Sequence, residues 1–134
     1  MRTEVITVET GTSPVVRDIT AEAKAFVAGE SDGLLHVYVP HATAGLAIIE
    51  TGSGSEEDLL RVLDDVLPAD DRWRHRHGPV GHGRDHLVPA FLPPYAVLPV
   101  VAGTLMLGTW QSICLVDPNR SNPTRQVRFS FLPA

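Results

Sequence analysis

Ser112-Ile113-Cys114-Leu115-Val116 is the stretch that decides the fold of this chain. Its apolar side chains would point to both faces of an extended segment, whereas a strand with one solvated face alternates apolar and polar residues. We therefore expect a central strand that is covered on both faces. Cys114 is the only cysteine in the chain, so it lacks an internal disulfide partner, and we expect a buried, unreactive thiol.

Further strands are expected on either side of this segment. The stretch Arg125 to Leu132 places Val127 and Phe129 on one face and Arg128 on the other, a pattern typical of a half-buried strand. Gly103 predicts a hairpin turn between two more strands. The other expected strands are Arg2 to Glu9, Leu34 to Val39, Leu46 to Ile49, Tyr95 to Val101 and Thr104 to Leu107.

Helix signals lie between these strands. Thr20 suits an N-cap for a helix that stops at Gly29, and Ser55 with Asp58 matches a capping box. The second helix is predicted to bury one apolar face and to end at Pro68. That face comprises Leu59, Leu60, Leu63, Val66 and Leu67. A short helix is expected within 85–92, and the whole pattern indicates an α+β fold.

Length and composition fit one domain spanning residues 1–134. No apolar run approaches the ~20 residues of a membrane-spanning helix, and the first residues lack the apolar block of a signal peptide. The net charge of −5 disfavours nucleic acid and anionic membranes as partners. We therefore expect a cytoplasmic protein. Its basic residues are ten arginines and Lys24, which either reflects genome composition or provides forks for carboxylate and phosphate.

The stretch 70–84 carries few large apolar side chains and is long for a loop in a compact domain. Four of the six histidines lie here or just beyond, namely His75, His77, His82 and His86. Residues four apart share a helix face, so His82 and His86 could bind one metal ion, although Gly81 and Gly83 make a helix doubtful. Alternatively, these are surface histidines of a flexible loop. Solvent-exposed loop positions are the default expectation for His75 and His77.

A second candidate site is His41-Ala42-Thr43-Ala44-Gly45, at the exit of a predicted strand. Thr43 can form local hydrogen bonds, and Gly45 would let the backbone approach a ligand closely. Alternatively, His41 is a satisfied turn histidine. Glu50 is either a carboxylate partner of this site or the first solvated residue after a strand.

Two more segments carry groups suited to a small ligand. Gly108-Thr109-Trp110-Gln111 offers hydrogen-bond donors and an aromatic plane, or else Trp110 belongs to the core. The stretch 117–125 places Arg120 and Arg125 in a turn, where they could hold a phosphate or simply be solvated. No phosphate loop of the Walker or dinucleotide type is present.

Taken in this order, these segments resemble the YjbQ-like family, whose members are often described as secondary thiamine-phosphate synthases. The resemblance spans nearly the whole chain, and Gly108-Thr-Trp-Gln111 is its most specific element. It implies an α+β fold with a curved mixed sheet and two to three helices. It also implies a homotrimer with sites near the subunit interfaces.

The resemblance further implies an enzyme acting on phosphorylated heterocycles, which would join a pyrimidine diphosphate to a thiazole phosphate. The implied catalytic residues are His41, His86 and Gln111, and the implied substrate-binding residues are Thr43, Gly45, Trp110, Arg120 and Arg125. A divalent metal, either zinc, magnesium or manganese, would be held by His41, His82 and His86. The alternative is a metal- or anion-binding oligomer that lacks catalytic activity.

The sequence departs from the usual pattern of that family at several positions. Ala42 stands where a second threonine is common, and Ile49 stands where an asparagine commonly precedes the glutamate, which leaves the site role of Glu50 open. His82 replaces an asparagine, and this replacement could add a ligand because imidazole binds transition metals better than an amide does. Asp85 either orients a histidine or caps a helix.

Overall fold

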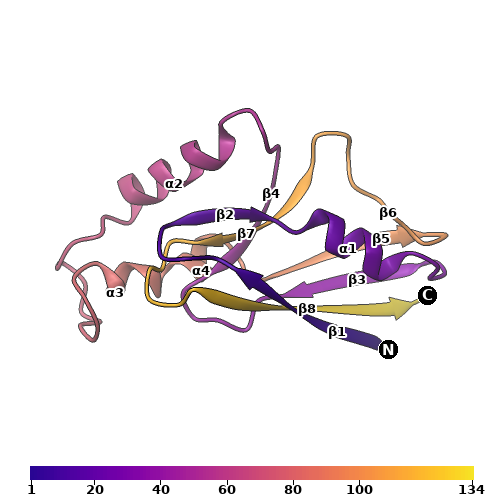
Figure 1. The fold of residues 1–134 in the computed structure, drawn as a ribbon, viewed down its shortest axis with the longest axis horizontal. Helices are drawn as coiled ribbons and strands as arrows, with labels where there is room; N and C mark the ends of the chain where they lie inside the picture. Colours follow the sequence, from indigo (N-terminus) through magenta and orange to yellow (C-terminus); the bar gives the residue numbers. More distant parts are fainter.

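The chain forms two β-sheets and four helical segments (Figure 1), described over residues 1–134 by a computed structural model. The five-stranded sheet has the order β1 (Arg2–Glu9), β8 (Thr124–Pro133), β3 (Gly33–Tyr38), β5 (Tyr95–Val101) and β6 (Thr104–Leu105). The three-stranded sheet has the order β2 (Val15–Asp18), β7 (Ser112–Asp117) and β4 (Gly45–Ile49). The helices are α1 (Thr20–Val27), α2 (Ser55–Val66), α3 (His82–Asp85) and α4 (Val88–Phe91).

The α+β class with a curved sheet is confirmed (Figure 1). Every strand pairing is antiparallel, so the expected mixture of parallel and antiparallel strands does not occur. The connections explain this difference. The segment with α1 leads from β2 to β3, and the segment with α2 leads from β4 to β5, so each joins strands of different sheets. Neither forms the crossover that places two parallel strands in one sheet.

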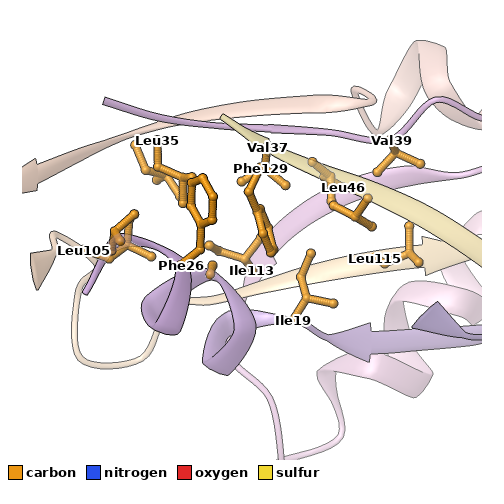
Figure 2. Close-up of a cluster of buried hydrophobic side chains, with 14 of the residues drawn as sticks. Ile19, Phe26, Leu35, Val37, Val39, Leu46, Leu105, Ile113, Leu115 and Phe129 are labelled. Carbon is orange, nitrogen blue, oxygen red and sulfur yellow. The ribbon is translucent and has the colours of Figure 1, made fainter. Parts of the chain in front are cut away.

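The main hydrophobic core lies between the two sheets and α1 (Figure 2). Leu35 and Phe129 contribute from the five-stranded sheet, Ile113 and Leu115 from β7, and Phe26 from α1. These five side chains are at most 5% exposed, and their burial makes this the main stabilising region of the fold.

The outer face of β7 is covered by α2 and its surroundings. Leu63 and Leu67 pack with Val116 and Val88 in a second apolar cluster. The prediction of a central strand covered on both faces is therefore confirmed. The prediction of a buried Cys114 is also confirmed, and burial raises the pKa of its thiol to about 12.

Some local predictions were wrong. Val66 is exposed because it lies on the solvent side of α2. Ser55 does not cap this helix. Gly54 occupies the N-cap with φ of 98°, and Glu56 accepts a hydrogen bond from the backbone of Gly52. Likewise, Ile19 rather than Thr20 precedes α1, and the Thr20 hydroxyl instead accepts a hydrogen bond from the backbone N–H of Ile113.

The outward face of the five-stranded sheet is unusually apolar. Exposed large side chains on it include Leu34, Tyr38, Tyr95, Val97 and Leu132. The ring of His36 lies near both tyrosines, which face each other across β3 and β5, with centroid distances of 6.2 and 6.3 Å. None of the helices has the length and apolar character needed to cross a membrane.

Candidate functional site

Four histidines gather at the end of the molecule that carries α3. The ring of His75 lies 4.0 Å, centre to centre, from the rings of both His77 and His86. His82 lies 4.8 Å from His86. Nitrogen atoms that could bind a metal on His75, His77 and His86 all lie within 4.8 Å of one another. We call these four residues the histidine cluster.

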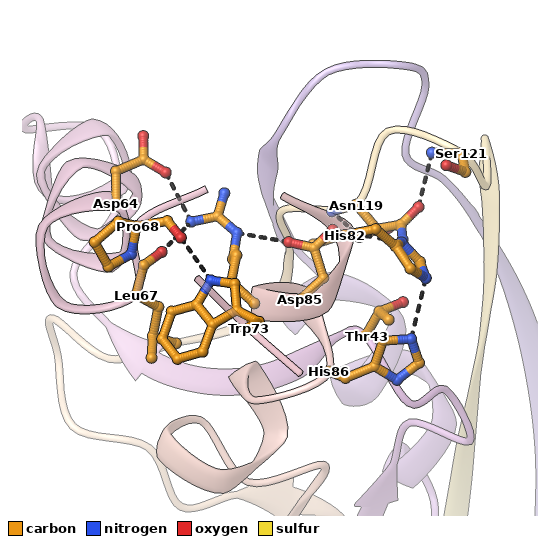
Figure 3. A network of polar contacts seen from close by, with 12 residues as sticks. Thr43, Asp64, Leu67, Pro68, Trp73, His82, Asp85, His86, Asn119 and Ser121 are labelled. Carbon is orange, nitrogen blue, oxygen red and sulfur yellow. Dashed lines mark hydrogen bonds and ion pairs between the residues drawn. The ribbon is translucent and has the colours of Figure 1, made fainter. Parts of the chain in front are cut away.

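Hydrogen bonds of Trp73 and Arg84 fix the loop that carries the cluster, and Figure 3 shows Trp73 beside Pro68. The indole Nε1 of Trp73 donates a hydrogen bond to the carbonyl of Pro68 at 2.8 Å, while its ring packs against the second apolar cluster. The buried Arg84 guanidinium binds Asp85 at 2.6 Å, Asp64 at 2.8 Å and the Leu67 carbonyl at 2.9 Å. The loop is therefore tied to the end of α2.

Glycine at position 83 allows the two arms of this loop to approach each other. A Cβ atom added there would lie 2.5 Å from the carbonyl oxygen of His75. The backbone of α3 thus contacts the backbone that carries His75. This contact brings residues from before and after the glycine-rich turn into one cluster.

A chain of polar contacts leads from the cluster into the protein. The Nε2 atoms of His86 and His82 are 3.0 Å apart, and Nδ1 of His82 is 3.2 Å from the amide nitrogen of Asn119 (Figure 3). The backbone N–H of Asn119 donates to Asp117, which forms a two-pronged ion pair with Arg125 at 2.7 and 3.0 Å.

Arg125 is part of this internal framework. Its side chain is 3% exposed, and it also donates a hydrogen bond to the hydroxyl of Thr43 at 2.8 Å. Thr43 and Arg125 were both predicted to bind substrate. The structure gives them partners within the protein, and they connect the His41 segment to the strand end that supports His82.

His41 lies outside the set of metal-binding nitrogens formed by His75, His77 and His86. Its Nε2 accepts a hydrogen bond from the backbone N–H of Gln126 at 2.8 Å. Burial, followed by the positive charge of Arg125, lowers the pKa of His41 below 6.5. The predicted ligand set of His41, His82 and His86 thus differs from the one that the geometry brings together, in which His75 and His77 take the places of His41 and His82.

The electrostatics favour neutral imidazoles at two positions of the cluster. Desolvation, followed by the neighbouring histidines, lowers the pKa values of His86 and His75. Burial raises the pKa of Asp85, and its hydrogen bond with Arg84 opposes that shift. Neutral histidines expose the lone pairs that a metal ion requires.

A cavity of about 260 Å³ adjoins the cluster, and both His82 and Arg120 line it. Arg120 is exposed and forms no ion pair, so its guanidinium is available to an anion. Of the two arginines predicted to bind phosphate, only Arg120 is in that position. The remaining lining residues are Ala69, Pro79, Val80, Gly81, Arg84, Asp85, Pro118 and Ser121.

The other predicted site residues lie elsewhere. Trp110 and Gln111 precede β7. Asn119, which contacts the cluster, follows the other end of β7, and the six residues of this strand separate the two ends. Trp110 is 74% exposed, and Gln111 accepts a hydrogen bond from the Gly108 backbone. Glu50 is exposed. It lies beside the end of β7 that Trp110 and Gln111 precede, because the neighbouring Ile49 pairs with Ser112.

Gly45 serves packing between segments in this structure. It is buried, and an added Cβ would lie 2.1 Å from the carbonyl oxygen of Leu92. The close approach that glycine permits is therefore made by the backbone that precedes β5. The predicted approach of a ligand at Gly45 is replaced by this contact.

Asn119 is a site residue that the sequence analysis did not single out, and the sequence left the roles of His75 and His77 open. Both histidines are exposed, as the default expectation had it, and they also contribute nitrogens to the cluster. The sequence signal that could have placed the two histidines in the cluster is the number of histidines close to Trp73. This tryptophan anchors a loop that otherwise lacks large apolar side chains. Asn119 gave no signal, since asparagine is common in turns.

The donor set suits a borderline transition metal. Imidazole nitrogens are good ligands for zinc, whereas magnesium prefers oxygen ligands. His75 and His77 are exposed and His86 is half-buried, so an ion could reach the cluster from solvent. Of the three metals expected from the sequence, zinc fits these residues best and magnesium fits least.

Comparisons with known proteins all lead to one family. A family model described as "UPF0047 protein YjbQ-like" matches residues 4–134. The UPF0047 protein Rv2556c of Mycobacterium tuberculosis is 55% identical over 132 residues, which cover 98% of each chain. A UPF0047 protein of Archaeoglobus fulgidus is 34% identical and covers 84% of this chain and 87% of its own.

Solved structures have the same fold. The crystal structure of APE1520 from Aeropyrum pernix K1 superposes with a TM-score of 0.91 at 33% identity and covers all of both chains. SSO2532 from Sulfolobus solfataricus P2, described as a YbjQ-like protein of unknown function, has a TM-score of 0.91 at 28% identity. That match covers 99% of this chain and 97% of the other.

Proposed function

The chain belongs to the UPF0047 family of YjbQ-like proteins, and on this premise we propose that it is a metal-dependent enzyme acting on phosphorylated small molecules. The observation that carries the proposal is the convergence of metal-binding nitrogens of His75, His77 and His86 within 4.8 Å. The reaction we propose is of the thiamine-phosphate synthase kind. In it, the thiazole nitrogen attacks the methylene carbon of a pyrimidine diphosphate, the carbon–oxygen bond breaks, and pyrophosphate leaves.

Each part of the cluster has a task in this proposal. His75, His77 and His86 would hold a divalent ion, and that ion would supply positive charge to the leaving pyrophosphate. Arg120, across the adjoining cavity, would bind phosphate oxygens through its planar fork. Neutral imidazoles suit this task because the ion keeps its full charge for the substrate.

Trp110 and Gln111 enter the proposal through a second copy of the chain. They are exposed and lie at the opposite end of β7 from the cluster, so they would reach a site only across a subunit boundary. There Trp110 would stack on the heterocycle, and Gln111 would offer its amide to it. A homotrimer supplies such a boundary, and the apolar outer face of the five-stranded sheet is the surface that would be buried in it. We place the protein in the cytoplasm in this proposal.

A second candidate function is binding of a metal or an anion with no catalysis. One observation favours it: of the five residues predicted to bind substrate, only Arg120 lines the cavity beside the cluster. Thr43 and Arg125 are engaged inside the protein. The cluster would then be a site for an ion, with Arg120 as an accessory anion contact.

Zinc-loaded protein incubated with a pyrimidine diphosphate and a thiazole phosphate separates the two candidates. The enzyme proposal predicts release of pyrophosphate and formation of the joined product, both abolished in His77→Ala. Lys24→Ala is the control, because this exposed residue of α1 belongs neither to the cluster nor to the outer sheet face that the trimer would bury. Zinc binding without turnover of these or other phosphorylated precursors would contradict the enzyme proposal and leave the binding function.

A further inference from the structure

Asn119 holds its side-chain amide in one orientation. The residue is 1% exposed, and its Oδ1 accepts a hydrogen bond from the backbone N–H of Ser121 at 2.7 Å (Figure 3). A backbone N–H only donates, so the atom that faces Ser121 must be the oxygen. The amide nitrogen of Asn119 therefore faces His82.

This orientation assigns the tautomer of His82 from the hydrogen-bond network. The amide nitrogen lies 3.2 Å from Nδ1 of His82 and can only donate, so Nδ1 must carry a lone pair. The proton of neutral His82 then sits on Nε2. That atom is 3.0 Å from Nε2 of His86, which must accept the hydrogen bond. The backbone N–H of Ser121 thus determines which atom donates in the contact of Asn119 with His82 and in the contact of His82 with His86.

We propose that Asn119 is a positioning residue that withholds His82 from the metal and keeps the cluster at three nitrogen ligands. This inference rests on the metal site proposed above. His82 lies beside the three residues whose nitrogens converge within 4.8 Å, namely His75, His77 and His86, and its protonated Nε2 has no lone pair with which to join them. Zinc sites with four protein ligands are closed and structural, whereas three protein ligands leave a position for an exogenous ligand.

The same tautomer defines which ligand suits that position. When the Nε2 lone pair of His86 is given to an ion, the Nε2–H of His82 loses its acceptor within the cluster. It is then a free donor, and His82 shares a cavity with the guanidinium of Arg120. A hydrogen-bond donor beside a fixed positive charge selects an oxyanion, so the ligand class is phosphate or pyrophosphate.

Asn119→Asp reverses the tautomer with little change in shape. The carboxylate keeps an acceptor for the Ser121 N–H and turns its second oxygen toward His82. Nδ1 of His82 then becomes the donor, and Nε2 gains a lone pair with which it can become a fourth ligand once the ring moves toward the ion. A carboxylate behind a histidine ligand also strengthens metal binding, so we expect zinc affinity to rise about 10- to 100-fold. Binding of inorganic phosphate to the zinc form is expected to weaken at least several-fold.

The experiment joins two readouts that a purely structural role of Asn119 would not move. Long-range ¹H–¹⁵N NMR spectra of metal-free protein should show His82 with Nε2–H in the wild type and Nδ1–H in Asn119→Asp. X-ray absorption of the zinc forms should show three imidazoles with an oxygen ligand in the wild type and four imidazoles in the variant. The isosteric Asn119→Leu, with neither donor nor acceptor, should populate both tautomers, and thermal unfolding checks that each variant is folded.

Each failure has a distinct meaning. An Nδ1–H form in the wild type, or four imidazole ligands on its zinc, would overturn the role of Asn119 while leaving the metal site in place. A wild-type protein with the assigned tautomer that binds no zinc would overturn the proposed metal site itself, and the role of Asn119 with it.

Discussion

The Nε2 atoms of His82 and His86 face each other at 3.0 Å, at one end of a polar chain that reaches Thr43 through Asn119, Asp117 and Arg125. Most of this chain is buried, and β7 and β8 carry its middle part. The buried polar chain therefore supports His82 and His86, whereas His75 and His77 come from an exposed loop. We expect the buried residues to determine stability and the exposed residues to determine binding.

The ion pair of Arg125 with Asp117 is the part of this framework on which stability depends most. Arg125→Ala would leave the fully buried carboxylate of Asp117 without its partner, and we expect a loss of about 3–5 kcal/mol in the free energy of unfolding. The matched control is Arg128→Ala, which removes an exposed arginine of the same strand and should cost within about 0.5 kcal/mol. Urea unfolding measures both, and equal losses would contradict this account of the pair.

Gly45 is expected to tolerate no side chain. In Gly45→Ala the new Cβ would lie 2.1 Å from the Leu92 carbonyl, and the backbone would have to move. We predict that the free energy of unfolding falls by about 1–3 kcal/mol, the usual range for overpacking. Gly108→Ala is the control, because its Cβ would meet only the movable end of Gln111 at 3.2 Å. Thermal melts in which both variants behave alike would show that the contact at Gly45 is not tight.

The pH dependence of stability should report on His41. Its pKa is lowered in the folded state, so the unfolded chain binds the proton more readily, and the contribution to stability is present above pH 6.5. Stability is then lost as the pH falls from 6.5 through the lower, folded pKa. His41→Gln removes this titration but keeps an acceptor for the Gln126 N–H.

Unfolding curves measured between pH 7.5 and pH 5 with a chelator present would test this. The variant is expected to lose less stability on acidification than the wild type, while the other histidines contribute equally to both. Identical pH profiles would mean that burial and the positive charge of Arg125 do not hold the His41 imidazole neutral.

Arg120 is expected to affect anion binding without affecting the fold. It is exposed and lines the cavity beside His82, so Arg120→Ala should leave the unfolding midpoint within a degree or two of wild type, the effect of roughly 0.5 kcal/mol or less. Affinity of the zinc form for pyrophosphate should fall about tenfold, the loss expected for one charge-assisted hydrogen-bonded contact. Calorimetric titration measures this, with Arg128→Ala as the control, and unchanged affinity would remove Arg120 from the site.

The strands whose side-chain pattern reflects their environment were predictable. Ile113 and Leu115 with Cys114 indicated a strand covered on both faces, and Val127 with Phe129 indicated a half-buried one; both predictions are confirmed. The edge strand β2 was missed, because it has only four residues and ends in Arg17 and Asp18. Its pairing with β7 is a tertiary contact that a local pattern does not reveal.

The site was predictable in part. Histidine spacing indicated His82 and His86 as neighbours, and the structure places their rings 4.8 Å apart. The approach of His75 and His77 depends on Trp73, Gly83 and the buried Arg84, whose partners lie up to 20 residues away. No periodicity encodes such contacts. The same holds for Asn119, which lies 37 residues from the histidine it orients.

Zinc stoichiometry and affinity, measured on untagged protein by calorimetric titration and elemental analysis, test the central claim most directly. We predict one zinc per chain in the wild type and in His41→Ala, and loss of that zinc in His75→Ala, His77→Ala and His86→Ala. His82→Ala should retain it. A wild-type chain that binds no zinc, or one whose zinc depends on His41 and not on His77, would contradict the account.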